Sequence, residues 1–398
     1  MFLMKFLKFC RTERESGKNI VLMFHHKGCK LYGNNMKFVA DEILKQNLNC
    51  QIYWYVKRKV LSKLNLKKEN NYGFPERIRV IYHKKSVLNI ARKSRVIISD
   101  NFTPNFILKD FHKKHQFMIN TWHGSLGIKK IFAAESVLRY NEEYKNNKTI
   151  DINNFDVFIS NSDFETTIYK RDLHFNNEIK MLGHPRNDVC FVNKQAQKDI
   201  RNKVCEEIGL DRNKKIVLIS PTFMNELNLK YVITCYLILF DFAAIKKAFE
   251  KHFNCKVQVL LRLHPEWQFV PYLDKFMEEN PFLINATSYP DIQELLVASD
   301  AMITDYSSCI FDFLFTRKPG FIFAPDRKHY EMTRGLYFPL EESPFPVAED
   351  NETLCKNIIN FDNNLYQKRV EEFLKSRNVV DDGHASERVV ELIKEHLK

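Results

Sequence analysis

The 398-residue chain contains 44% hydrophobic and 28% charged residues, which excludes a disordered protein and, at this length, a single small domain. The formal net charge of +12 predicts anionic partners such as nucleotides, polyphosphates, nucleic acid or acidic lipid. The basic residues form no long run, however, so the alternative is a basic surface without such a partner. Nine cysteines without a C-x-x-C motif or a Cys/His cluster indicate reduced thiols in a cytoplasmic protein and predict no metal site.

Two apolar stretches are candidate membrane segments, and neither is expected to cross a bilayer. The N-terminal MFLMKFLKFC lacks the long apolar core and cleavage site of a signal peptide, and both an interfacial anchor and a plain first helix are compatible with it. The run at 231–245 is interrupted by Asp241 and is too short to span. We expect a cytoplasmic protein, with peripheral attachment to the inner face of the cell membrane as an option.

The first half of the chain alternates short apolar runs with helical patterns. A helix is predicted at 34–46, and a polar helix predicted at 193–209 follows this half. Strands are predicted at 19–24, 50–56, 77–83, 94–100, 116–122 and 157–160. Apolar runs with little alternation, separated by helices, indicate a parallel sheet covered on both faces.

The same pattern restarts after the polar helix. Strands are predicted at 215–223, 256–265, 282–286, 301–304 and 320–324, and helices at 365–377 and 385–397. We therefore expect an α/β protein with a first domain at 1–192, a second at 193–364 and C-terminal helices at 365–398.

Unusual polar residues gather where these strands end, which is where open α/β sheets bind ligands. After the strand at 301–304, Ser307 and Ser308 are expected at a helix start, where hydroxyls and unpaired backbone N–H groups bind anions. A single serine would more often be a plain helix cap. Asp312, one helical turn on, would repel phosphate but suits the hydroxyls of a ribose or polyol.

Two further strand ends carry candidate ligand groups. In RLHP, Arg262 offers a planar fork for a phosphate oxygen, and His264 lies on the same side of the strand. A satisfied structural histidine is the alternative for His264. Pro221 and Thr222 end another strand and would present a hydroxyl and a backbone N–H to the same cleft.

The segment NTWHGSLGIKK in the first half supplies the candidate general base, His123, because an imidazole titrates near neutral pH. Gly124 follows and allows close approach to the backbone. In ISNSDFE, Ser162 and Glu165 form a capping-box pattern, which helix initiation explains. In GHPRND, Arg186 is expected to point to the cleft and His184 to be a loop residue.

Eight segments together resemble the CDP-glycerol glycerophosphotransferase family, the polymerases and primases of teichoic acids and related capsular polymers. They run in order from about residue 117 to 390: TWHGS, ISNSDFET, GHPRND, ISPTF, LLRLHP, SYPDIQELLVASDAMITDYSSCIFDF, KPGFIFAPD and DGHASERV. YGNNMKFVADEI, near Gly33, resembles the acceptor-side loop and helix of the family more loosely.

The resemblance implies a GT-B architecture, with two Rossmann-like domains facing across a cleft and C-terminal helices crossing back to the first. It implies transfer of glycerol phosphate, or ribitol phosphate, from a CDP-activated donor to a hydroxyl of a lipid-linked or oligomeric polyanionic acceptor, with release of CMP. His123 and His264 match the essential histidines of the family. The donor-binding positions that it implies are Gly124, Ser125, Arg186, Pro221, Thr222, Arg262, Ser307, Ser308 and Asp312.

Departures from the family pattern border the donor cleft, so glycerol, ribitol and other polyols remain open as the transferred group. They are His184 in place of an aromatic residue, Ser125-Leu126 after the HG pair, and the segment that follows ISPTF. No metal or cofactor is expected beyond the CDP-glycerol or CDP-ribitol donor. The alternative function is a GT-B glycosyltransferase that uses a nucleotide sugar in capsule synthesis, and nucleic-acid binding is not expected.

Overall fold

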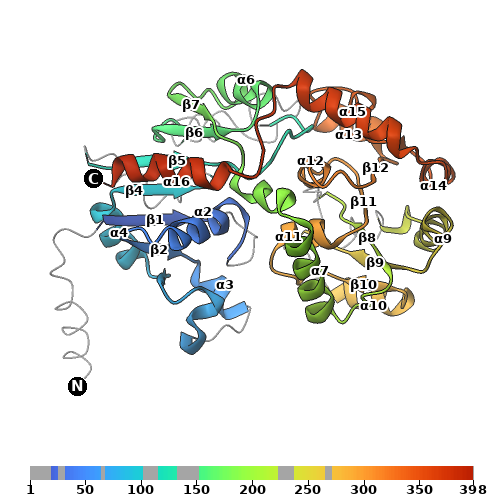
Figure 1. Ribbon diagram of the computed structural model, residues 1–398, viewed down its shortest axis with the longest axis horizontal. Coiled ribbons are helices and arrows are strands. Elements are labelled where there is room, and N and C mark those ends of the chain that lie inside the picture. The colour runs from blue at the N-terminus through green and yellow to red at the C-terminus, as the bar shows by residue number, and fades with distance from the viewer. Residues whose placement is uncertain are drawn as a thin grey trace.

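The computed structural model contains two parallel β-sheets, one in each half of the chain (Figure 1). The seven-stranded sheet has the order β3-β2-β1-β4-β5-β6-β7, and the six-stranded sheet has the order β10-β9-β8-β11-β12-β13. The residues described are 19–25, 32–63, 68–101, 115–131, 152–222, 237–264 and 271–397. The N-terminal decapeptide and most of the apolar run at 231–245 lie outside these ranges.

The strands of the first sheet follow the predicted apolar runs, with ends that differ by a few residues. They are β1 (Asn19–Phe24), β2 (Cys50–Tyr55), β3 (Ile78–Ile81), β4 (Val96–Ser99), β5 (Phe117–Asn120), β6 (Val157–Ser160) and β7 (Glu178–Met181). β7 was not predicted, because it is an edge strand with no fully buried residue and so lacks an apolar run. The other predicted strands of this half are confirmed.

The second sheet confirms the predicted restart of the pattern. Its strands are β8 (Lys215–Ile219), β9 (Val257–Leu261), β10 (Leu283–Asn285), β11 (Ala301–Thr304), β12 (Gly320–Phe323) and β13 (Val347–Ala348). β8 and β9 end four residues before the predicted ends, so the polar residues that follow them lie on loops at the edge of the sheet. This places Thr222 and His264 beyond the strands and not within them.

Helices cover both sheets and join the two halves. They are α2 (Asn34–Lys45), α3 (Arg58–Lys63), α4 (Lys84–Lys93), α6 (Asp163–Asp172), α7 (Lys194–Ile208), α9 (Phe242–Phe253), α10 (Pro271–Glu279), α11 (Ile292–Ala298), α12 (Cys309–Leu314), α13 (Arg327–Thr333), α14 (Asn351–Ile359), α15 (Asn363–Ser376) and α16 (Ala385–His396). Within the described ranges, every helix is too short or too polar to cross a bilayer.

The last two helices connect the halves in different ways (Figure 1). α16 crosses back as predicted, since Val389, Val390 and Ile393 are buried in the core of the first sheet. α15 packs on the second half through Val370 and Phe373. Directly after this helix, the carbonyl of Arg377 accepts from the backbone N–H of Asp163 in the first half at 3.1 Å.

Each sheet has one point at which the chain order reverses, between β1 and β4 in the first sheet and between β8 and β11 in the second. The carboxyl ends of the strands at such a point form a crevice that binds ligands in open α/β sheets. Asp100 follows β4 and Asp305 follows β11. Both carboxylates are buried and hydrogen-bonded, which orders the two crevice edges.

Candidate active site

His123 lies on the loop after β5, and the backbone fixes its tautomer. Its Nδ1 is 2.9 Å from the carbonyl oxygen of Asp100. Because a carbonyl can only accept, Nδ1 carries the proton and Nε2 keeps its lone pair. The carboxylate of Asp100 is in turn 2.5 Å from Nδ1 of His25, which follows β1. The first crevice thus presents an imidazole in the form that a general base requires.

The two predicted histidines follow strands of different sheets, but burial and the positive charge of Lys129 lower the pKa of both. Burial lowers the pKa of His123 to about 4, and the charges of Arg186 and Lys129 act in the same direction. Burial also lowers the pKa of His264 to about 4, again with Lys129 contributing. Both imidazoles are therefore neutral at pH 7. Lys129 was not singled out from the sequence, because it stands among dispersed lysines with no motif of its own.

The loop that carries His123 is strained and held in place. Trp122 has φ of 52° and Leu126 has φ of 45°, a left-handed conformation that costs a non-glycine residue about 1–2 kcal/mol. Nδ2 of Asn35 donates to the carbonyls of Thr121, at 3.1 Å, and of Trp122, at 2.9 Å. Asn35 lies in the first turn of α2 and is fully buried. A strained loop held by side-chain bonds is typical of a functional site.

This loop faces the turn that precedes α12. A Cβ atom on Gly124 would lie 3.5 Å from Oγ of Ser308. Ser307 and Ser308 are half-buried, and the Ser308 side chain makes no capping hydrogen bond. α12 begins at Cys309, slightly later than predicted, and has six residues. The structure therefore brings Ser308 of the predicted hydroxyl pair against the predicted base loop.

The same loop continues into the second half. The backbone N–H of Lys130 donates to the carbonyl of Gly335 at 3.1 Å, and that of Tyr337 donates to Ile128 at 2.8 Å. Leu126 and Ile128 are buried among apolar side chains of the second half. The segment after His123 is thus a structural bridge, so the position of the base depends on how the two halves pack.

At the second crevice, Asp305 organises the end of β8. Its carboxylate accepts from the backbone N–H of Thr222 at 2.9 and 3.0 Å, from the Thr222 hydroxyl, and from the N–H of Tyr306 at 2.6 Å. The polar groups of Thr222 are therefore engaged with Asp305. Contact of Pro221 and Thr222 with a donor stays a prediction.

Arg262 is bound to the protein in a way that the sequence did not indicate. Its Nη1 donates to the carbonyls of Ala286, at 3.2 Å, and of Tyr289, at 2.9 Å. The side chain is buried, and these two hydrogen bonds hold the loop after β10 in place. Its part in binding phosphate stays a prediction.

Arg186 and Asp312 form an ion pair between the two halves. Nη2 of Arg186 is 3.0 Å from Oδ1 of Asp312, and Nη1 donates to Oδ1 of Asn34 at 3.1 Å. Nη2 also lies 3.3 Å from Oγ of Ser125. Arg186 and Asp312 are 4% and 3% exposed, so each is nearly enclosed by protein. The donor contacts expected of Arg186, Ser125 and Asp312 stay predictions.

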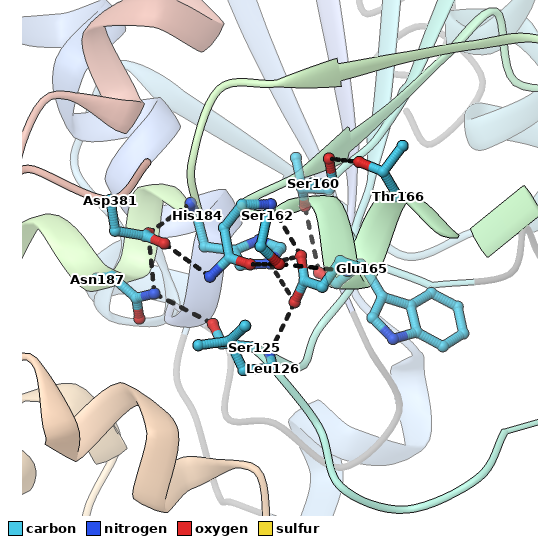
Figure 2. Close-up of polar contacts among 12 residues, drawn as sticks. Ser125, Leu126, Ser160, Ser162, Glu165, Thr166, His184, Asn187 and Asp381 are labelled. Atoms are coloured by element: carbon cyan, nitrogen blue, oxygen red, sulfur yellow. Dashed lines mark hydrogen bonds and ion pairs between the residues drawn. The ribbon is translucent and has the colours of Figure 1, made fainter. Parts of the chain in front are cut away.

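Glu165 does more than start a helix. Ser162 caps α6 by accepting from the N–H of Glu165 at 3.2 Å, as predicted. The reciprocal half of the capping box is wrong: the Glu165 carboxylate accepts from the N–H of Asn161 at 2.9 Å, from Leu126 at 2.8 Å and from the ring of His184 (Figure 2). This second role could not be predicted from the sequence, because the capping pattern already explained Glu165.

The comparisons with known proteins agree with the motifs. The family model described as CDP-glycerol:poly(glycerophosphate) glycerophosphotransferase matches residues 4–395. The chain belongs to this family. Membership covers nearly the whole sequence, including both crevices and α16.

Curated relatives of this glycerophosphotransferase family include glycerol-phosphate enzymes of staphylococci. A teichoic acid poly(glycerol phosphate) polymerase of Staphylococcus epidermidis is 27% identical over 397 residues, which are 97% of this chain and 52% of the polymerase. The chain thus spans about half the length of that relative. A teichoic acid glycerol-phosphate transferase of Staphylococcus aureus is 25% identical, over 94% of this chain and 93% of the transferase.

A solved structure from the same family confirms the predicted fold. A variant of the wall teichoic acid polymerase TagF, soaked with CDPG, superposes with a TM-score of 0.78 and 25% identity, over 96% of this chain and 89% of the TagF chain. The GT-B architecture expected of the glycerophosphotransferase family is therefore present. Among the described residues, no group of three or more His, Cys, Asp or Glu side chains is placed to hold a metal ion.

Proposed function

We propose that this chain transfers a polyol phosphate, most simply glycerol phosphate, from a CDP-activated donor to a hydroxyl of a teichoic-acid-like or capsular polymer. The observation that carries the proposal is the geometry of His123. Its Nδ1 donates to the Asp100 carbonyl, so Nε2 can accept a proton, and its loop lies against Ser308 at the second crevice. Family membership and the glycerol-phosphate relatives support the choice of chemistry.

In the proposed step, the acceptor hydroxyl gives its proton to Nε2 of His123. The acceptor oxygen forms a bond to the β-phosphorus of the donor, and the bond from that phosphorus to the bridging oxygen breaks. CMP leaves with the bridging oxygen and its electron pair. Phosphoryl transfers of this kind depend mainly on positioning and on charge stabilisation.

The other groups of the site would hold the diphosphate. His264 is neutral at pH 7, so it would supply an N–H donor and not a positive charge. Lys129 would supply the charge, and the hydroxyls of Ser307 and Ser308 would donate hydrogen bonds. Metal independence is part of the proposal, and it predicts that chelator leaves the rate of CMP release unchanged.

The test begins with a thermal-shift screen of CDP-glycerol, CDP-ribitol and UDP-sugars, followed by CMP-release assays with every binder. His123→Ala should lower turnover by about 10²–10⁴-fold while donor binding and folding remain. His384→Ala, which changes an exposed histidine paired with Glu387, is the matched control. Undiminished turnover in His123→Ala would rule out this base. A glycosidic product from a UDP-sugar, without a phosphodiester, would instead favour the glycosyltransferase alternative.

We further propose that the protein works in the cytoplasm at the inner face of the membrane on a lipid-linked acceptor. The support is the net charge of +12, because basic side chains near an anionic leaflet each contribute about 1 kcal/mol. Flotation with anionic liposomes, and not with neutral ones, is expected. Equal flotation with both, or with neither, contradicts electrostatic docking.

A further inference from the structure

A buried histidine outside the proposed catalytic pair is linked to the catalytic loop. Nε2 of His184 lies 2.9 and 3.1 Å from the two carboxylate oxygens of Glu165. Oε1 of Glu165 accepts the backbone N–H of Leu126 at 2.8 Å. Leu126 stands three residues after His123. Figure 2 shows the imidazole and the carboxylate facing each other, with Leu126 on the other side of the carboxylate.

A second route leads from the same histidine back to the same loop. The backbone N–H of His184 donates to Oδ1 of Asp381 at 2.9 Å, and Nδ2 of Asn187 donates to that oxygen at 3.0 Å. Nδ2 of Asn187 also donates to Oγ of Ser125 at 3.1 Å. The network therefore ends on two adjacent residues of the loop, Ser125 and Leu126 (Figure 2).

We propose that His184 is a positioning residue: it holds Glu165 against the backbone of the loop that carries His123. This inference rests on the proposed function, since it assigns His123 the part of base. The structural reason is the left-handed backbone of Leu126, whose φ is 45°. Without an acceptor for its N–H group, this residue would relax toward an ordinary conformation and turn the loop with it.

Because His184 and Glu165 are both buried, the Glu165 carboxylate depends on the partners that the protein supplies. Their residues are 0% and 3% exposed, so water cannot replace a lost partner. Burying a carboxylate that has lost its partner is strongly unfavourable. The charged and titratable groups that face the pair are Asp381 from the C-terminal segment, Arg186 from the same loop as His184, and Tyr169 from α6. Of these, the Tyr169 hydroxyl also hydrogen-bonds to Glu165, so the His184 ring and Tyr169 share the carboxylate.

The C-terminal segment takes part in this positioning through Asp381. Its Oδ2 accepts from Nδ2 of Asn161 at 2.7 Å, next to the start of α6. Asp381 thus joins the residue before the cap of α6 to the loop of His184. The crossing of the chain back to the first half therefore supports the base loop as well as the core.

The test compares His184→Leu, His184→Gln and the control His384→Gln in the full chain. Leu fills space without a donor, whereas the Gln amide can donate to Glu165. We expect His184→Leu to lower kcat for CMP release about 10²-fold, as misplacement of a reacting group does, with little change in KM for CDP-glycerol. His184→Gln should regain most of the rate, and the exposed control should match the wild type.

Amide hydrogen exchange at residues 121–126 gives a readout that does not need turnover. Exchange there should accelerate in His184→Leu, return toward wild type in His184→Gln and stay unchanged in the control. Wild-type exchange together with wild-type kcat in a folded His184→Leu protein overturns the inference. If His184→Leu does not fold, Glu165→Met takes its place, because it removes the acceptor of the Leu126 N–H group; wild-type exchange and kcat in this variant also overturn the inference. If the wild type releases no CMP from any CDP-polyol, the proposed function fails, while the exchange data still decide the positioning of the loop.

Discussion

Gly124 of the base loop lies directly against Ser308 of the turn before α12, where a Cβ atom on the glycine would be 3.5 Å from the serine Oγ. One residue belongs to the first sheet's crevice and the other to the second's. The two halves therefore approach each other at this contact so closely that only a small side chain fits. Gly124 has no left-handed φ, and a methyl group there would make an ordinary contact, so the limit at this position falls on side chains larger than alanine.

Two substitutions at Gly124 should show how large a side chain the contact with Ser308 tolerates. Gly124→Ala places a methyl group at an ordinary contact distance and should be tolerated, whereas Gly124→Val should push Ser308 and His123 apart and lower turnover about 10²-fold. CMP release and thermal unfolding measure the two effects. Gly127→Ala, whose Cβ would lie 3.8 Å from Cβ of Ser308, is the control. Wild-type turnover in Gly124→Val would show that the contact does not constrain the site.

The ion pair between Arg186 and Asp312 should be costly to break from one side. Arg186→Met leaves the Asp312 carboxylate buried without its cation, which is expected to lower the unfolding free energy by about 3–5 kcal/mol. Adding Asp312→Leu should recover much of this loss. Chemical denaturation measures both. Lys356→Met, which breaks the exposed pair with Glu352, should change the unfolding free energy by only about 0–1 kcal/mol.

The fold was largely predictable because its central strands are buried on both faces. Runs such as 19–24 and 301–304 are almost wholly apolar, and the structure buries all or nearly all of their residues. Edge strands do not carry that pattern, so β7 was missed. Strand ends were placed late at β8 and β9, because apolar residues such as Leu263 continue into the loop and are buried there.

The site was only partly predictable, for a different physical reason. The rule that ligands gather at strand ends made His123, His264 and Ser308 candidates without any knowledge of contacts. It could not show that Arg186 and Asp312 pair with each other, because 126 residues separate them. Glu165 and Asn35 were missed because local patterns, a helix cap and a helix start, already explained them.

Burial mainly lowers the pKa of His123, and the charge of Lys129 should add a smaller shift to the acid limb of the pH–rate profile. A general base acts only when neutral, so the rate falls as the pH drops through its pKa, about 4 for His123. Lys129→Gln removes a positive charge that lowers the pKa of His123 and of His264, so the limb should move to higher pH. Lys130→Gln makes the same charge change one residue away and should leave the midpoint in place. Circular dichroism across the same range separates this shift from acid unfolding, and an unmoved midpoint in Lys129→Gln would contradict the shared environment.

The pairing of His184 with Glu165 should also appear in the pH dependence of stability. Burial opposes the charged ring, but the charge and hydrogen bond of Glu165 outweigh burial and raise the pKa of His184 above 6.5. The folded chain therefore keeps a proton that the unfolded chain releases, so this stabilisation is complete below pH 6.5 and is lost as the pH rises through the folded pKa. Each unit by which the pKa is raised is worth about 1.4 kcal/mol.

Urea unfolding at a series of pH values from 6.5 upward should thus show the wild type losing more unfolding free energy than His184→Gln. Asp381, whose pKa burial raises to about 6, still titrates at the lower end of this range, so the difference between the two proteins, and not the wild-type slope alone, reports on His184. The control His384→Gln should keep the wild-type slope, because that exposed ring has no part in the buried network. Parallel curves for the wild type and His184→Gln would mean that His184 is neutral in the folded protein, and Glu165 would then be held by a neutral N–H donor alone.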